Sequence, residues 1–69
     1  MESELDKMIN FYMNNKIGVH IETVSDKFYN GLILENSNKH IVLLDRKIGE
    51  IFILLSEIKL IEKFLGGKQ

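Results

Sequence analysis

The chain has 69 residues, a mass of 8.0 kDa and a formal net charge of −1, which fits one small domain and excludes a large enzyme. A domain of this length buries only about 60% of the surface that its unfolded chain exposes, so a disulfide, a metal or self-association usually adds stability. Cysteine is absent, and His20 and His40 are far apart in the sequence, which makes a disulfide impossible and a metal cage a poor expectation. Self-association is therefore the remaining way in which a chain of this length would gain stability.

Charge and targeting signals narrow the range of partners. The pI near 6.1 reflects no basic excess, so tight binding to duplex DNA is not expected. The first ten residues, MESELDKMIN, lack the basic and apolar regions of a secretory signal, and no apolar run approaches the roughly 18 residues of a membrane span. We therefore expect a cytoplasmic protein without a membrane partner, with one domain over residues 1–65 and a flexible C-terminal tail at 66–69.

The first predicted element is an amphipathic helix. Its apolar stripe at helical spacing consists of Leu5, Met8, Ile9, Tyr12 and Met13. Ser3 is the expected N-cap, Glu4 and Asp6 suit the positive end of the helix dipole, and Asn14–Asn15 is expected to supply the left-handed residue that ends the helix. Phe11 lies off the stripe. The helix is expected to cover one end of a barrel, and a partner-binding helix is the alternative.

After the helix the apolar period changes from 3.6 to 2, which indicates strands. Five short strands are predicted at 17–22, 28–34, 40–44, 50–55 and 58–64, separated by turns at 24–27, 45–49 and 56–57 and by a polar loop at 35–39. Gly31 lies inside the second strand, where a glycine marks a bend or a close approach of another backbone. Five short strands with tight connections favour a small antiparallel barrel, because closure removes exposed edges.

The fourth predicted strand is apolar at every position from 51 to 55. Both faces of such a strand require burial, which a monomer of this size can hardly supply. An exposed apolar strand near a sheet edge invites aggregation unless another copy of the chain pairs with it in a closed arrangement. This segment is therefore the expected place of self-association.

The run from Lys16 to Phe64 resembles the Sm/LSm fold, the family that includes the bacterial RNA chaperone Hfq. The first Sm motif is matched by Val19-His20-Ile21, a turn, and Tyr29-Asn30-Gly31-Leu32-Ile33, and the apolar spacing of the second motif is matched over 51–61. The resemblance implies a mainly β, Sm-like, strongly bent five-stranded antiparallel barrel with an N-terminal α-helix. It also implies a homo-oligomeric ring, a hexamer or heptamer, in which the fourth strand of one subunit pairs with the fifth of the next. The interface residues would be Ile51, Phe52, Ile53, Leu54, Leu55, Ile58 and Leu60.

The resemblance further implies binding of single-stranded RNA. This chain departs from the family, however, at the residues that form the family's uridine pocket. Leu54-Leu55 stands where the family has Arg-Gly, and the Lys and His of the Hfq motif are missing nearby. The family's Asp and Asn positions fall on Ser37 and Ile41 without gaps, or on Asn36 and His40 after a shift of one residue. The candidate RNA-binding residues are Asn36, Ser37, Asn38, Lys39, His40 and Ser56, whose amides, hydroxyls, ring and cation suit a splayed base and a phosphate.

We therefore expect a ring-forming, non-catalytic protein without a cofactor that holds single-stranded RNA as a chaperone or scaffold. A weak site repeated around a ring gains by avidity, so a nearly neutral subunit can still bind. One alternative is a protein-interaction or structural ring that has lost the RNA pocket, as Leu54-Leu55 and the low pI would allow. Another is a monomeric small barrel of the SH3-like or transcription-elongation type, which the apolar fourth strand disfavours.

Three smaller patterns carry weaker interpretations. His20 and Glu22 share one strand face and could bind a metal or act as base and orienter, yet two residues do not make a site. Arg46-Lys47 lies in a predicted turn, where solvation is the default and contact with an RNA backbone is the alternative. The mixed charges at 57–63 indicate a solvated or cross-subunit surface rather than a patch of one sign.

Overall fold

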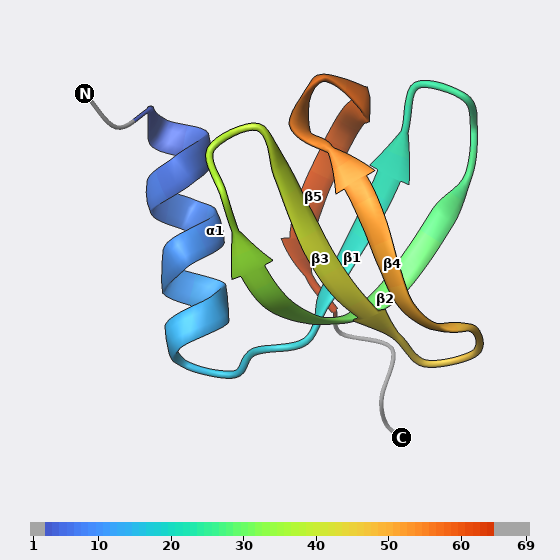
Figure 1. The fold of residues 1–69 in the computed structure, drawn as a ribbon, viewed down its shortest axis with the longest axis horizontal. Coiled ribbons are helices and arrows are strands. Elements are labelled where there is room, and N and C mark those ends of the chain that lie inside the picture. The colour runs from blue at the N-terminus through green and yellow to red at the C-terminus, as the bar shows by residue number, and fades with distance from the viewer. Residues whose placement is uncertain (1–2, 65–69) are drawn as a thin grey trace.

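The structure is a computed structural model that describes residues 3–64, which form one helix and one sheet (Figure 1). The elements are α1 (Glu4–Asn14), β1 (Val19–Thr23), β2 (Phe28–Asn36), β3 (His40–Asp45), β4 (Gly49–Leu54), the 3-10 turn η1 (Leu55–Glu57) and β5 (Ile58–Lys63). All neighbouring strands are antiparallel, in the order β4-β3-β2-β1-β5. The prediction of a mainly β fold with an N-terminal helix and five antiparallel strands is confirmed. The predicted tail at 66–69 lies outside the described residues.

The start of α1 agrees with the sequence prediction and its end does not. The hydroxyl oxygen of Ser3 accepts a hydrogen bond from the backbone N–H of Asp6 at 3.1 Å, which makes Ser3 the N-cap. At the other end Asn15 has a φ of −101°, and Lys16 is the left-handed residue, with a φ of 54°. The reason is local, because the backbone and side chain of Asn15 both donate to the carbonyl of Phe11.

The apolar stripe of α1 lies against the sheet, as predicted. Ile9 has no exposed surface, and the other stripe residues are partly buried against the core. Phe11 lies off the stripe and is 57% exposed. Within the described residues no helix is both long and apolar enough to pass through a membrane. The helix therefore serves as a cover for one side of the sheet, where it packs on β2.

The hydrophobic core is made by the alternate residues of the strands that face α1 and one another. The buried apolar residues are Ile9, Val19, Ile21, Ile33, Ile41, Leu43, Ile53 and Ile61. In β1 the burial alternates at every residue, which is the period-2 pattern of a strand with one face in the core. Burial of this kind removes apolar surface from water and supplies the main favourable term for folding.

Every strand has at least one boundary that differs from the sequence prediction, and the differences beside β3 change the loop before it and the turn after it. β2 continues to Asn36 because Glu35 and Asn36 still pair with β3 after a bulge that follows Ile33. The loop between these strands is therefore shorter than the predicted 35–39. At the other end of β3, Asp45 pairs with Gly49, so these two residues belong to strands and the turn covers 46–48 only.

At Gly31 the backbone of β3 lies where a side chain of β2 would otherwise be. A methyl group at Gly31 would collide with the backbone carbonyl of Leu44 and crowd the Cα of Asp45. No side chain fits there, which confirms the predicted close approach of another backbone at this glycine. This contact fixes where the end of β3 crosses β2 and hence the position of the turn that follows.

Candidate functional site

The predicted RNA-binding loop is held in one conformation by its own hydrogen bonds. The side-chain amide of Asn36 donates to Asn10 of α1 at 3.1 Å, and its oxygen accepts from the backbone N–H of Asn38 at 3.2 Å. Asn38 has a φ of 77°, a left-handed conformation that asparagine tolerates better than most residues. Asn36 is therefore used to connect the loop to the helix, and the exposed amide of the loop is that of Asn38.

Ser37 and His40 face each other across the loop. The hydroxyl oxygen of Ser37 lies 2.7 Å from Nδ1 of His40, within hydrogen-bond distance. The backbone N–H of Ser37 also donates to the carbonyl of His40 at 3.0 Å. Ile41, the other residue considered for this site, is completely buried. A ligand on this surface would meet Ser37 and His40 and would not reach Ile41.

The ring of His40 stacks on the ring of Phe52, with centroids 4.0 Å apart and planes inclined by 22°. His40 pairs with Leu54 and Val42 pairs with Phe52, so the two rings lie diagonally across neighbouring strands on the outer face of the sheet. Phe52 is 62% exposed. Sequence reasoning assigned Phe52 to the subunit interface and missed its contact with the loop, which only the strand register reveals.

The end of β4 adjoins the same loop. The backbone N–H of Leu55 donates to the carbonyl of Lys39 at 2.8 Å, which places η1 beside the loop. Ser56 is exposed in η1, and Lys39 is exposed in the loop. The structure therefore gathers the candidate RNA-binding residues at one end of the sheet, with Asn36 turned toward the helix.

The predicted interface strands are the two edges of the sheet. β4 and β5 each have one neighbour among the described strands, β3 and β1 respectively. On β4 the side chain of Ile53 is in the core, whereas Phe52 and Leu54 are exposed. On β5 Leu60 is exposed, and the partly buried interface residues Ile51, Leu55 and Ile58 pack against the core.

His20 lies at the centre of a polar cluster on the outer face of β1. Its Nδ1 is 2.7 Å from the side-chain oxygen of Asn30, and its Nε2 is 3.2 Å from a carboxylate oxygen of Glu22. The hydrogen bond with Asn30 raises the pKa of His20, burial acts against it, and Glu22 and the nearby charge of Glu62 raise it further. No group of three potential metal ligands occurs within residues 3–64, so this cluster reads as a charged hydrogen-bond network.

Asp45 organises the β3–β4 turn. Its carboxylate accepts hydrogen bonds from the backbone N–H groups of Asn30, Lys47 and Ile48 at 3.2, 2.8 and 3.1 Å. Burial alone would raise the pKa of Asp45, but these backbone donors outweigh it and hold the pKa below its usual value. Arg46 follows directly, and its guanidinium lies 5.5 Å from the ring centroid of Phe64.

The chain matches no protein-family model and no curated protein.

Proposed function

We propose that this chain is an Sm-like, ring-forming protein that binds single-stranded RNA as a chaperone or scaffold in the cytoplasm. The observation that carries the proposal is the stacked pair of His40 and Phe52 beside the polar loop. An unpaired base needs an aromatic surface on which to stack and hydrogen-bond partners for its edge. Phe52 offers the first, and Ser37, Asn38 and Ser56 offer the second.

The ring part of the proposal rests on the two open edges of the sheet. An edge strand presents unpaired backbone groups that readily pair with another chain. Joining β4 of one copy to β5 of the next is a head-to-tail contact, which forms a ring when the rotation from copy to copy closes on itself. Closure would cover the exposed Leu54 and Leu60 and would supply the apolar burial that a chain of this length lacks.

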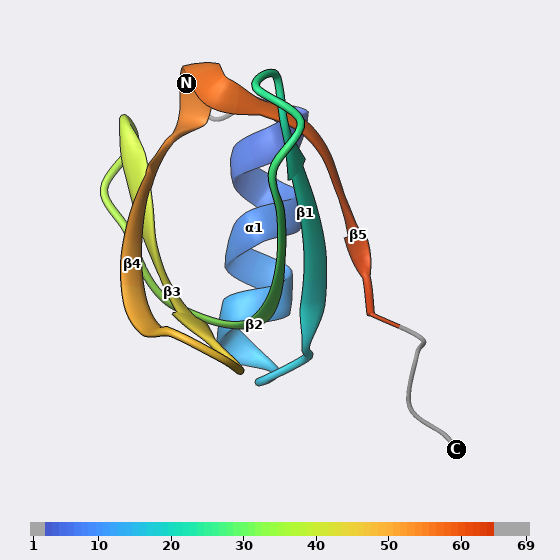
Figure 2. The same ribbon diagram turned by 90° about the vertical axis from the view of Figure 1, so that its right-hand side faces the viewer.

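We further propose that the sheet is strongly bent into a barrel within each subunit. Two features support the bend: the backbone contact at Gly31, and the curve of β2 in Figure 2, which leads from the side of β3 and β4 to that of β1 and β5. In a ring of such barrels, the polar loops between β2 and β3 would lie together on one face. The weak site at Asn38 and His40 would then be repeated around the ring, and avidity would raise the affinity for a strand that spans several subunits.

Two measurements test the proposal. Light scattering behind a sizing column should give the mass of six or seven subunits, and a stable monomer contradicts the ring. Fluorescence anisotropy with U-rich and A-rich oligonucleotides should detect binding that weakens with salt. His40→Ala and Asn38→Ala should each weaken it, whereas Lys7→Ala on the exposed side of α1 serves as the control. No binding to either oligonucleotide at low salt contradicts the RNA function.

A second candidate function is a protein-interaction ring. It is favoured by the exposed apolar residues on the outer face of β2, β3 and β4 that lie outside the proposed contact, namely Leu34, Leu44 and Phe52. Apolar surface that remains open after ring closure would suit a protein partner. A ring that forms normally and binds neither oligonucleotide would support this function over RNA binding.

A further inference from the structure

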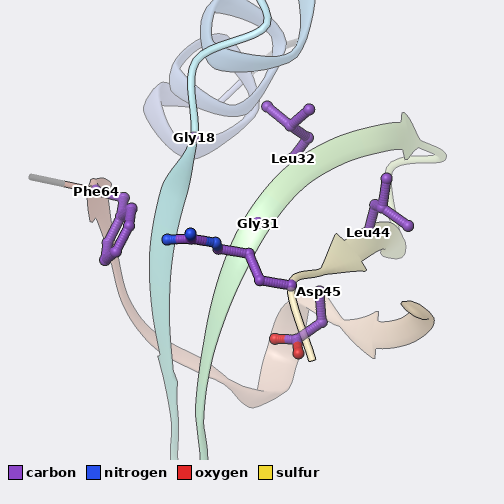
Figure 3. A pocket seen from close by; sticks show the side chains of 7 residues that line it. Gly18, Gly31, Leu32, Leu44, Asp45 and Phe64 are labelled. Carbon is purple, nitrogen blue, oxygen red and sulfur yellow. The ribbon is translucent and has the colours of Figure 1, made fainter. Parts of the chain in front are cut away.

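A hollow of about 570 Å³ lies on the outer face of the molecule, away from the predicted RNA-binding loop (Figure 3). Its floor is the backbone at Gly31 of β2 and at Gly18, which lies directly before β1. Phe64 stands on one side of this floor, and Leu44 and Asp45 stand on the other. The remaining lining residues are Leu32 and Arg46.

Gly18 leaves room in the hollow, because a Cβ there would meet no atom closer than 3.9 Å, whereas at Gly31 the backbone of Leu44 occupies the position of a side chain. The backbone N–H of Phe64 donates to the carbonyl of Gly18 at 2.9 Å, and that of Arg46 donates to the carbonyl of Asn30 at 3.0 Å. Phe64 and Arg46 are thus anchored on opposite sides of the strand pair. Their side chains meet over the glycines, where the guanidinium carbon lies 5.5 Å from the ring centroid of Phe64.

Arg46 has no salt-bridge partner among residues 3–64. Within this described part of the chain its guanidinium lies over the face of the Phe64 ring, a favourable but modest interaction at an exposed site. A guanidinium that is planar, charged and weakly hydrated stacks on flat groups and binds phosphate or carboxylate by paired hydrogen bonds. The hollow therefore combines an apolar, flat-walled space with one available cation at its rim.

A second, polar hollow of about 450 Å³ adjoins the first, and the two share Asp45 and Arg46. It is lined in addition by Phe28, Asn30 and Lys47. The Asp45 carboxylate here accepts hydrogen bonds from three backbone N–H groups, which hold it against the turn. Arg46, Lys47 and the amide of Asn30 leave this second space suited to an anion with several acceptor oxygens.

From this juxtaposition we propose that the two hollows together bind one nucleotide of a single-stranded RNA, with the base against Phe64 and the phosphate at Arg46 and Lys47. The ligand must be flat and apolar at one end and anionic at the other, and a nucleotide has that form. The inference rests on the proposed RNA-binding function and adds a second contact point at the β3–β4 turn. An RNA strand bound at both sites would run from the loop before β3 to the turn after β3.

Three variants change the site in different ways. Phe64→Leu removes the stacking ring and should weaken binding of a single-stranded oligonucleotide about fivefold or more. Gly18→Val fills the floor, since a Cβ there meets nothing closer than 3.9 Å, and should weaken binding to a similar extent. Arg46→Gln should lower the slope of log affinity against log salt by about 0.7, the value for one phosphate contact in a single strand.

Two control variants make the same kind of change elsewhere on the chain, one matched to Phe64→Leu and one to Arg46→Gln. Phe11→Leu removes an exposed ring from α1, and Lys7→Gln removes an exposed charge there. Both should leave the affinity and the salt slope unchanged. Phe64→Leu should lower the affinity without changing the slope, because a ring releases no counterions. Every variant is first checked for the parent's mass in solution and for its thermal midpoint.

A direct probe separates a nucleotide from other flat anions. In nitrogen-15 NMR, adenosine 5′-monophosphate should shift the amide signals of Gly18, Gly31 and Arg46 more strongly than adenosine or ribose 5-phosphate. N-acetylphenylalanine, a flat carboxylate of the peptide class, is the competing ligand. Tighter binding of that compound, or an absence of shifts at these amides, overturns the proposal.

The outcomes also separate this site from the proposed function. If the parent chain binds no oligonucleotide, both fail. If it binds, and His40→Ala weakens binding while Phe64→Leu, Gly18→Val and Arg46→Gln do not, the loop site stands and the nucleotide site at the turn is wrong. If all four weaken binding and the controls do not, both sites are supported.

Discussion

His40 and Phe52 stack face to face across neighbouring strands, with ring centroids 4.0 Å apart. This single contact joins the polar loop at the start of β3 to the apolar edge strand β4. A stack of this kind favours a fixed ring orientation, and the exposed surface of Phe52 extends the flat area. The same contact also places the candidate RNA site directly beside the candidate subunit interface.

Replacing Phe52 should affect RNA binding. Phe52→Leu keeps an apolar side chain on the edge strand but removes the ring that stacks on His40. We expect the affinity for a single-stranded oligonucleotide to fall by about fivefold or more, since stacking of one base is worth about 1–3 kcal/mol. Anisotropy titration measures the change, and Phe11→Leu is the matched control. If the Phe52→Leu protein still assembles as the parent does and its affinity for the oligonucleotide is unchanged, Phe52 is excluded from the RNA site.

A charge on the exposed side of β4 should prevent assembly. Leu54→Lys places an ammonium group on the edge strand, a device by which natural sheets block edge pairing. We expect the mass in solution to fall from that of a ring to that of a monomer, measured by light scattering. Val24→Lys makes the same change at an exposed turn residue and should leave the mass unchanged. A Leu54→Lys protein that still assembles would contradict the β4–β5 contact.

Gly31→Ala should destabilise the fold, because its methyl group collides with the backbone of Leu44. Overpacking of this kind costs about 1–3 kcal/mol, which corresponds to a lower thermal midpoint by several degrees for a domain of this size. Gly18→Ala provides the matched control, since its methyl group meets only ordinary contacts, and the midpoint should change little. Thermal unfolding followed by circular dichroism compares the two, and equal midpoints would refute the close approach at Gly31.

Stability should depend on pH through His20. Its pKa in the folded protein is raised above the ordinary value of 6.5, chiefly by the hydrogen bond with Asn30. The folded chain therefore holds this proton more tightly than the unfolded chain does. The stabilisation is fully present below about pH 6.5 and is lost as the pH rises through the folded pKa.

The measurement is the denaturant midpoint at a series of pH values, together with NMR titration of the His20 ring. His20→Gln should flatten the part of the pH dependence that lies above about pH 6.5. Asn30→Ala should lower the pKa of His20, because it removes the largest of the contributions that raise it. A His20 pKa at or below 6.5 in the parent chain would show that the network does not favour the imidazolium.

Much of the fold follows from local patterns in the sequence. Ser3 at the start of an apolar stripe predicted the beginning of α1, and alternation predicted β1, because both signals depend on neighbours in the chain. The ends of elements were less predictable. Whether Asn15 or Lys16 takes the left-handed conformation depends on which donor captures the carbonyl of Phe11, a competition that composition does not decide.

The candidate sites divide in the same way. The loop residues from Asn36 to His40 became candidates because the family resemblance implies a base pocket at this loop and their side chains are polar. The role of Asn36 as a link to Asn10 depends instead on where α1 lies. No sequence pattern linked Phe64 to Arg46, because the two residues are far apart in the sequence. Their contact exists because backbone hydrogen bonds hold Phe64 at Gly18 and Arg46 at Asn30, on either side of the pair formed by β1 and β2.

The sequence by itself determined the order of the elements, the face of α1 that is buried and the need of a short chain without cysteine for further burial. Only the tertiary structure decided which outer residues meet: His40 with Phe52, and Arg46 with Phe64. The physical reason is that periodicity fixes the face on which a side chain lies, whereas strand register and backbone approach fix its neighbours. Register depends on the whole sheet at once, and no local pattern contains it.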